Sequence, residues 1–243
     1  MLAVCTTAGF VLLDPHTLKK APCSVPPTHA LPSPPTASTW TSDNSSLFVV
    51  QGNAIHRYNS AGTPLGSVTL SPTTNPVTAL VSKDRGNTVL IGTDTQVAAL
   101  DVSSGRVAFQ LDTHSTPVSG LALSPDAALV ASVSRAEGGG SSEVHVHTLA
   151  AASHVEIQGL PRRGDVTACT FHTHSKAKLL LAVGTQLLVY DIAKPAAPSK
   201  TIPLDRKSGE IVAITCSPFS KALVAVGCSS GVVNLVDLDK EKG

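Results

Sequence analysis

The sequence predicts an all-β fold of the β-propeller kind, built from repeated four-stranded sheets. Two sequence markers recur in phase at intervals of 41 to 48 residues, close to the length of one propeller blade. Between the markers, short runs rich in Val, Leu, Ile and Thr are bounded by Gly, Asn, Asp or Ser, as strands are. No helical period of useful length interrupts these runs.

The first marker is an apolar or aromatic residue followed by a small polar one, at the end of a strand-like segment. Successive markers lie 42 to 47 residues apart. The six pairs are Leu13-Asp14, Tyr58-Asn59, Leu100-Asp101, His147-Thr148, Tyr190-Asp191 and Val236-Asp237. We interpret each pair as the end of the third strand of a repeat.

The second marker is a tight turn between two apolar strands. Pro presets the backbone for such a turn, and Asp and Ser can hydrogen-bond to nearby amides. The five turns are Thr41-Ser42-Asp43, Ser82-Lys83-Asp84, Ser124-Pro125-Asp126, His172-Thr173-His174 and Ser217-Pro218-Phe219. Later in the repeat, Gly105 and Gly231 stand where a hairpin needs a positive φ.

The markers divide the chain into repeat units within one expected domain, residues 1–243. The units cover about 1–20, 36–70, 76–112, 117–160, 165–204 and 210–243. We expect five full four-stranded blades and part of another. The second full blade is predicted to have strands at 88–92 and 96–101, and the last at 211–216.

Three segments depart from the repeat. Residues 15–39 are rich in proline, which favours an extended, solvated path and cannot donate to a sheet. Residues 136–142 contain three successive glycines, typical of a flexible hairpin tip. Residues 194–203 contain three prolines and are expected to be a connector.

Composition excludes several classes of partner. The formal net charge is +1 and 14% of residues are charged, so direct binding to nucleic acid or an anionic membrane is not expected. No apolar stretch is long enough for a transmembrane helix. The five cysteines form no C-x-x-C pair, which favours a reducing, intracellular location.

The markers resemble those of the WD-repeat family. Ser124-Pro125-Asp126 matches the family's usual turn, and Tyr190-Asp191 stands where Trp-Asp ends the third strand. His114 is similar to the histidine of the Gly-His pair that leads into a blade. No repeat here has a true Trp-Asp pair, so we expect the family's buried His-to-Asp network to be mostly absent and apolar packing to dominate.

The resemblance implies a non-catalytic protein-interaction scaffold. Because the family usually closes with seven blades, it also implies an incomplete ring truncated at the C-terminus; an open arc is the alternative. Within the family, the chain is similar to the fungal Nedd-type branch, which targets the γ-tubulin complex to microtubule-organising centres. The resemblance lies in Leu2-Ala3-Val4-Cys5, the Pro-rich loop, and the turn Cys216-Ser217-Pro218-Phe219-Ser220-Lys221 that leads to Leu235-Val236-Asp237-Leu238. This implies spindle-pole or γ-tubulin-complex partners and a cytoplasmic or cytoskeletal location. A ribosome-biogenesis scaffold in the nucleus or nucleolus is the alternative.

Two groups of residues have ligand types that zinc uses. His145 and His147 leave the same face of a predicted strand, but no third ligand is obvious and a packed strand face explains them. Cys169, His172 and His174 fall on the tight-turn marker, so turn chemistry explains that group. We therefore expect neither a metal nor another cofactor.

Catalytic signatures are also lacking, so we do not expect an enzyme or a small-molecule substrate. No G-x-S-x-G elbow is present, and the glycines at 138–140 lack the lysine of a phosphate-binding loop. A propeller-fold hydrolase, with residues converging at one face, is the less favoured alternative. Arg162 and Arg163, on a predicted loop, are the candidate partner-contact residues.

Overall fold

The computed structural model describes residues 2–6, 9–13, 17, 19, 35–70, 79–82, 87–135, 141–151, 153–161 and 164–240. Within these ranges the chain is all β, apart from one 3-10 turn at Arg206–Ser208. None of the described helical structure is long or apolar enough to cross a membrane. The chain divides into two compact units, Met1–Asp112 and Thr113–Gly243, at the boundary of two predicted repeats.

The first unit contains a two-stranded sheet and two four-stranded antiparallel sheets, paired in sequence order. The strands are β1 (Leu2–Thr6) and β2 (Gly9–Leu13); β3 (Ala37–Trp40), β4 (Ser46–Gln51), β5 (Ala54–Asn59) and β6 (Pro64–Thr69); and β7 (Ala79–Ser82), β8 (Thr88–Gly92), β9 (Gln96–Asp101) and β10 (Arg106–Asp112).

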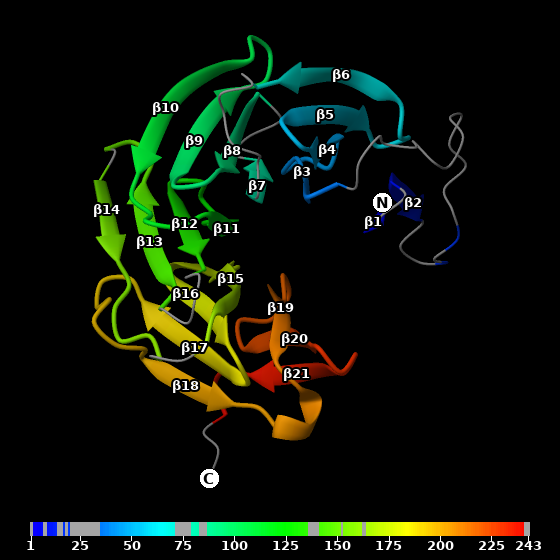
Figure 1. The fold of residues 1–243 in the computed structure, drawn as a ribbon. Helices are drawn as coiled ribbons and strands as arrows, with labels where there is room; N and C mark the ends of the chain where they lie inside the picture. Colours follow the sequence, from blue (N-terminus) through cyan, green and yellow to red (C-terminus); the bar gives the residue numbers. More distant parts are fainter. Residues whose placement is uncertain are drawn as a thin grey trace. The chain divides into compact units, whose positions relative to one another are not determined.

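The second unit contains three antiparallel sheets, also paired in sequence order (Figure 1). The strands are β11 (Val118–Leu123), β12 (Leu129–Ser134), β13 (Glu143–Thr148) and β14 (Ser153–Glu156); β15 (Val166–His172), β16 (Ser175–Val183), β17 (Gln186–Asp191) and β18 (Lys200–Pro203); and β19 (Ile211–Cys216), β20 (Leu223–Cys228) and β21 (Val233–Asp237).

The first marker is confirmed as the end of the third strand at five of its six positions; at the sixth, Leu13 ends β2 and Asp14 lies outside the described residues. β5, β9, β13, β17 and β21 each end at its polar residue. Asp101 shows why a polar residue recurs there: its Oδ1 accepts the backbone N–H groups of Ser103 at 2.9 Å and Ser104 at 2.8 Å. The side chain thus caps the turn that leads into the fourth strand.

The second marker is confirmed as the turn between the first and second strands where the chain is described. Ser124 Oγ donates to Asp126 Oδ1 at 2.7 Å and accepts the Leu129 N–H at 2.9 Å. Ala127 closes this turn with a φ of 54°. The turn that begins at Ser82 extends outside the described residues.

The two predicted hairpin glycines also have the expected conformation. Gly105 has a φ of 67° and Gly231 a φ of 85°. Side chains other than glycine rarely adopt such values. The predicted strands at 88–92, 96–101 and 211–216 coincide with β8, β9 and β19.

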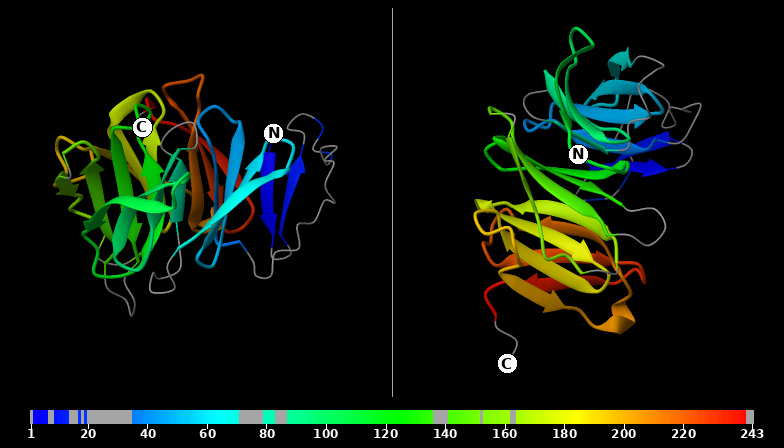
Figure 2. Two further views of the ribbon diagram at one scale, coloured as in Figure 1. Left: turned by 90° about the horizontal axis from the view of Figure 1, so that it is seen from above. Right: turned by 60° about the vertical axis from the view of Figure 1, so that its left-hand side comes forward.

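The sheets of each unit stack face to face through aliphatic side chains. In the second unit, β17 has both faces buried: Leu188 and Tyr190 pack toward β11–β14, and Leu187 and Val189 toward β19–β21. Figure 2 shows the sheets of this unit as successive layers. In the first unit, β4 is likewise buried on both faces. As predicted, the cores are aliphatic.

The structure corrects two details. Residues 194–203 are not only a connector, because β18 forms within them and pairs with β17. The last repeat, which was counted among the five full four-stranded blades, has three strands in the described chain, at the three strand-like runs of its sequence. That the sheets form one domain, a propeller ring, stays a prediction.

Candidate functional site

The candidate site is a group of imidazoles on the sheet β11–β14, which we call the histidine cluster: His114, His145, His147 and His154. His145 and His147 leave the same face of β13, because side chains two residues apart share a face. His154 of β14 stands opposite His147, and His114 lies in the segment before β11. The cluster therefore comes from two strands of this sheet, β13 and β14, and from the segment that leads into it.

The two faces of β13 differ in polarity. Val144 and Val146 point into the aliphatic core that β11–β14 shares with β15–β18. His145 and His147 point the other way and are also buried, with exposed fractions of 7% and 0%. Burying polar side chains is costly unless they find partners, so the polar face of this sheet requires an explanation.

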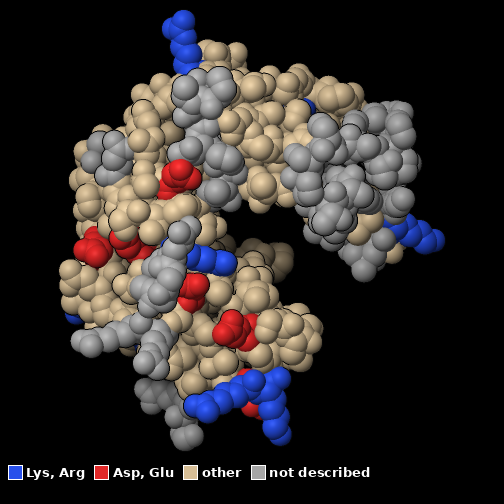
Figure 3. Space-filling view, viewed as in Figure 1, with Lys and Arg blue, Asp and Glu red and all other residues tan. Residues whose placement is uncertain are grey.

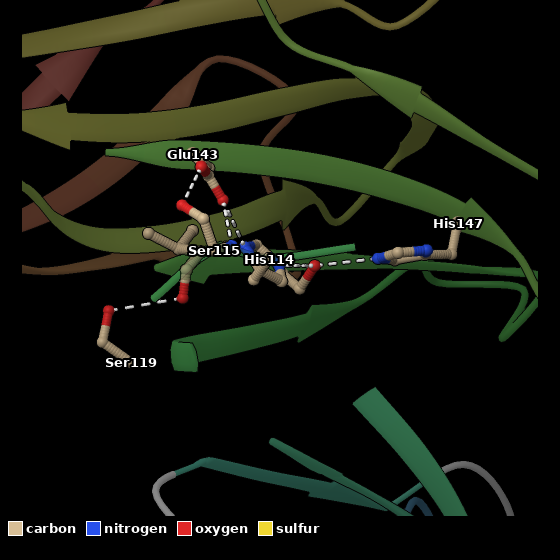
Figure 4. A network of polar contacts seen from close by, with 7 residues as sticks. His114, Ser115, Ser119, Glu143 and His147 are labelled. Carbon is tan, nitrogen blue, oxygen red and sulfur yellow. Dashed lines mark hydrogen bonds and ion pairs between the residues drawn. The ribbon is translucent and has the colours of Figure 1, made fainter. Parts of the chain in front are cut away.

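A hydroxyl group links two of the imidazoles (Figure 4). Ser132 Oγ lies 2.7 Å from His114 Nε2 and 2.8 Å from His147 Nε2. A hydroxyl donates one hydrogen bond and can accept others, so one imidazole accepts from Ser132 while the other donates to it. This chain of hydrogen bonds contains two histidines and a serine but no aspartate, so it differs from the His-to-Asp network that was expected to be mostly absent.

Glu143 completes the polar face at the start of β13. Its carboxylate accepts hydrogen bonds from the backbone N–H of Ser115, at 2.9 Å, and from the Ser115 hydroxyl. Its Oε2 lies 3.6 Å from His114 Nδ1, too far for a good hydrogen bond. Candidate ligand atoms of Glu143, His114 and His145 all lie within 4.8 Å of one another.

Burial favours the neutral form of the three buried imidazoles. Burial, reinforced by the neighbouring His145, lowers the pKa of His114 to about 4 and that of His147 to about 3. Burial also lowers the pKa of His145. Among the described residues, His114 Nδ1, His147 Nδ1 and both ring nitrogens of His145 have no hydrogen-bond partner. Neutral imidazoles with free lone pairs are the form that binds metal ions.

The sequence interpretation of His145 and His147 found no third ligand, but the structure brings two candidates close. Glu143 stands two residues before His145 on the same strand face, which the period of two could have indicated. His114 comes from 31 residues earlier in the chain, and only the folded sheet brings it to β13.

The second predicted group does not form a comparable site. His172 Nε2 donates to the carbonyl oxygen of Lys221 at 2.8 Å, and its Nδ1 accepts the His174 N–H at 3.1 Å. Burial raises the pKa of the Cys169 thiol to about 12, which disfavours the thiolate that binds metals. Turn chemistry therefore accounts for His172, as predicted.

The predicted contact residues Arg162 and Arg163 lie outside the described residues. On the face seen in Figure 3, most of the surface is uncharged, and Lys and Arg side chains gather near the lower edge.

A second feature of the unit is the outer edge of β21. This strand pairs with β20 on one side, and no described strand pairs with its other side. Val233 and Leu235 are 67% and 75% exposed. The other third strands, β5, β9, β13 and β17, each pair with a fourth strand at this position.

A groove of about 370 Å³ runs beside that edge. Its apolar walls include Ile202 and Leu204, from the end of β18 and just after it, and Leu235 and Val236 of β21. Asp237 and Lys240 line it as well. The groove therefore offers an apolar surface directly beside unpaired backbone groups.

Three of the four outer strands of the four-stranded sheets have features that hinder further pairing, whereas β14, with the sequence SHVE, and β21 do not. β10 has a register irregularity between Val107 and Phe109, and β6 begins with Pro64. β18 carries Lys200 at one end and Pro203 at the other. Bulges, prolines and lysines are the usual protection of sheet edges. β21, with the sequence VNLVD, has neither proline nor lysine.

The best-defined carboxylates of the described chain serve turns. The pKa values of three turn carboxylates are lowered to about 2, mainly by a hydrogen bond from a nearby hydroxyl group. The pairs are Asp43 with Thr41, Asp101 with Ser103, and Asp126 with Ser124. Carboxylates with such low pKa values are poor general acids or bases at neutral pH. They explain the recurring markers and do not suggest catalysis.

No protein-family model matches the chain. No curated protein sequence matches it either.

Proposed function

We propose that this protein is a non-catalytic scaffold of the β-propeller kind that binds other proteins. Among the described residues, the outer edge of β21 is the surface best suited to such a partner, which would add an extended strand there. The observation that carries this proposal is the combination of an edge unpaired in the described chain with two strongly exposed apolar side chains, Val233 and Leu235. Long, unprotected apolar edges are where strand addition occurs.

The hydrogen-bond pattern identifies the groups that the partner uses. The backbone N–H of Leu238 donates to Ala222, and the carbonyl oxygen of Val232 accepts from Cys228. Because hydrogen-bonded and non-hydrogen-bonded pairs alternate in an antiparallel ladder, the N–H groups of Val233, Leu235 and Asp237 point away from β20. These three N–H groups are available to an added strand.

The groove defines the side chains of the partner strand. An added strand presents alternate side chains to one face, so every second residue would face the apolar wall of Ile202, Leu204 and Val236. We expect a segment of about four to seven residues, the length of the fourth strands observed here, with aliphatic residues at alternate positions. In such recognition, the main chain supplies affinity and the pockets supply specificity.

The specific partner follows from the family resemblance. The resemblance favours components of the γ-tubulin complex or the spindle pole as partners. The cellular role would then be to target that complex to microtubule-organising centres. Pre-ribosomal factors are the alternative set. The exposed turn carboxylates, with pKa values near 2, disfavour the propeller-hydrolase alternative.

Affinity purification of the tagged full chain from cells, with mass spectrometry of the recovered proteins, tests the proposal. Leu235→Pro removes an outward N–H and is expected to abolish capture of the partner. Leu235→Ala keeps the N–H and should retain part of it. Thr201→Pro, an exposed position on the protected edge of β18, is the matched control and should bind as the unmodified chain does.

The outcomes test the β21 site and the identity of the partner separately. Equal recovery with Leu235→Pro and Thr201→Pro would overturn the β21 site. Recovery of neither γ-tubulin-complex components nor pre-ribosomal factors would overturn both named partner sets. Circular dichroism of each variant shows whether the fold is retained.

A further inference from the structure

We infer that the histidine cluster contains a binding site for a divalent metal ion of the zinc class, formed by His114, Glu143 and His145. Two imidazole nitrogens and one carboxylate oxygen are a donor set that zinc uses when three protein ligands leave a fourth position for water. The candidate ligand atoms of the three side chains lie within 4.8 Å of one another. Imidazole nitrogens favour zinc and its transition-metal neighbours over magnesium or calcium.

The first support is the unsatisfied state of His145. Its side chain is more than nine-tenths buried, yet neither ring nitrogen has a hydrogen-bond partner. Its ring stands edge-on to that of His114, with 4.7 Å between the centroids. Buried polar groups in native proteins almost always have a partner, and an unmet one requires an explanation such as an ion. A metal ion would satisfy one of these nitrogens.

The second support is that the other two ligands are already held by neighbouring groups. Ser132 bonds to Nε2 of His114, which leaves Nδ1 directed toward Glu143. Ser115 bonds to the Glu143 carboxylate through its N–H and its hydroxyl. Metal-binding histidines and carboxylates typically have such outer partners, which fix tautomer and orientation.

The proton arrangement is consistent with metal binding. When Nδ1 of His114 binds an ion, Nε2 carries the proton and donates it to Ser132. Ser132 then donates its hydroxyl proton to Nε2 of His147, which leaves the proton of neutral His147 on Nδ1. Ser132 thus accepts one hydrogen bond and donates the other.

The geometry needs only local adjustment. Ligand bonds of roughly 2.0 to 2.2 Å in a tetrahedral zinc site place the ligand atoms about 3.3 to 3.6 Å apart. His114 Nδ1 and Glu143 Oε2 are already 3.6 Å apart, so the ring of His145 is the group that must move closer. A bound ion would link the segment before β11 to β13.

Zinc titration of the purified, chelator-treated full chain tests this site. We expect one Zn²⁺ per chain by calorimetry, and a raised melting temperature because the ion binds the folded state. Co²⁺ should give the visible absorption of a four-coordinate site. His145→Ala should weaken binding by more than the roughly 10- to 100-fold expected for loss of an outer partner such as Ser132.

Matched variants separate this site from other histidines. His145→Ala removes a side chain that has no hydrogen-bond partner, so the folded sheet should be retained. Glu143→Gln should also weaken binding, and the exposed His174→Ala should leave it unchanged. Absence of zinc binding, or unchanged affinity in both His145→Ala and Glu143→Gln, would overturn the inference. Loss of binding in His174→Ala alone would assign the ion to another sheet and also overturn it.

Discussion

Strands β17 and β21 occupy equivalent positions in successive sheets, but their surroundings differ. Four of the six residues of β17 are buried, on both faces. In β21 only Val236 is buried, while Val233 and Leu235 are exposed. Both strands are aliphatic and end in a capping Asp. The sequence of a third strand therefore does not reveal whether it serves the core or a surface; the presence of neighbouring strands decides.

The largest difference should be seen when one leucine of each strand is truncated. Leu188→Ala in β17 removes a 2%-exposed side chain and should lower the free energy of unfolding by about 2–5 kcal/mol. Leu235→Ala in β21 removes a 75%-exposed side chain and should change it by less than about 0.5 kcal/mol. Urea unfolding followed by circular dichroism measures both. Similar losses would show that β21 is buried in solution.

Strand β13 occupies the same position in its sheet as β17 and β21 do in theirs, but one of its two buried faces is polar. Ser132→Ala leaves His114 Nε2 and His147 Nε2 without their shared partner and should cost about 1–3 kcal/mol. Ser119→Ala, which loses only a 3.3 Å contact to a backbone carbonyl, is the control and should cost less. Urea unfolding of the two chelator-treated variants gives the difference. Equal costs would mean that the hydroxyl link adds no stability.

The same polar face makes stability depend on pH. His114 and His147 have pKa values lowered to about 4 and 3 in the folded chain, against about 6.5 when unfolded. The unfolded chain therefore binds more protons below pH 6.5, and stability should fall as the pH drops from about 6.5 toward 4. The nearby Glu143 opposes this lowering for His114, while His145 and His154 reinforce it for both.

Melting temperatures of the metal-free chain at pH 7, 6, 5 and 4 measure this dependence. His147→Asn should flatten the decline, because one of the neutral buried imidazoles is gone. The exposed His174→Asn is the comparison variant and should decline as the unmodified chain does. An identical decline in all three chains would contradict the assignment to the histidine cluster.

The smallest effect should come from protecting the edge of β21. Leu235→Lys gives this strand the kind of charged residue that β18 has in Lys200. Self-association by strand pairing should decrease, with little change in stability, because the side chain points to solvent. Light scattering at increasing protein concentration measures the change. Thr201→Lys, on the already protected edge of β18, should have no effect.

The repeat could be predicted from the sequence because its markers have local causes. The cap formed by Asp101 and the turn formed by Ser124 and Asp126 need only residues a few positions apart. Aliphatic runs between such turns then fix the strands, and the bounds of β8, β9 and β19 were obtained directly. Each of these features depends on short-range hydrogen bonds and a period of two.

The candidate metal site could be predicted only in part. The spacing of His145 and His147 showed two imidazoles on one face, and the same reasoning includes Glu143. His114 joins them through pairing of β11, β12 and β13, which strand composition alone does not specify. The exposure of Val233 and Leu235 was beyond local reasoning, because both resemble core residues in any sequence pattern.

The capping oxygen at the end of four of the five third strands has an evolutionary consequence. Asn59, Asp101, Asp191 and Asp237 each accept a backbone N–H two residues further on. The cap requires only a side-chain oxygen at hydrogen-bonding distance, and the aliphatic strand faces require only side chains of suitable volume. Duplicated repeats can therefore accept substitutions at most positions while their length and strand order remain. The common origin of such repeats then stays visible in the spacing of the markers after sequence identity between the repeats has been lost.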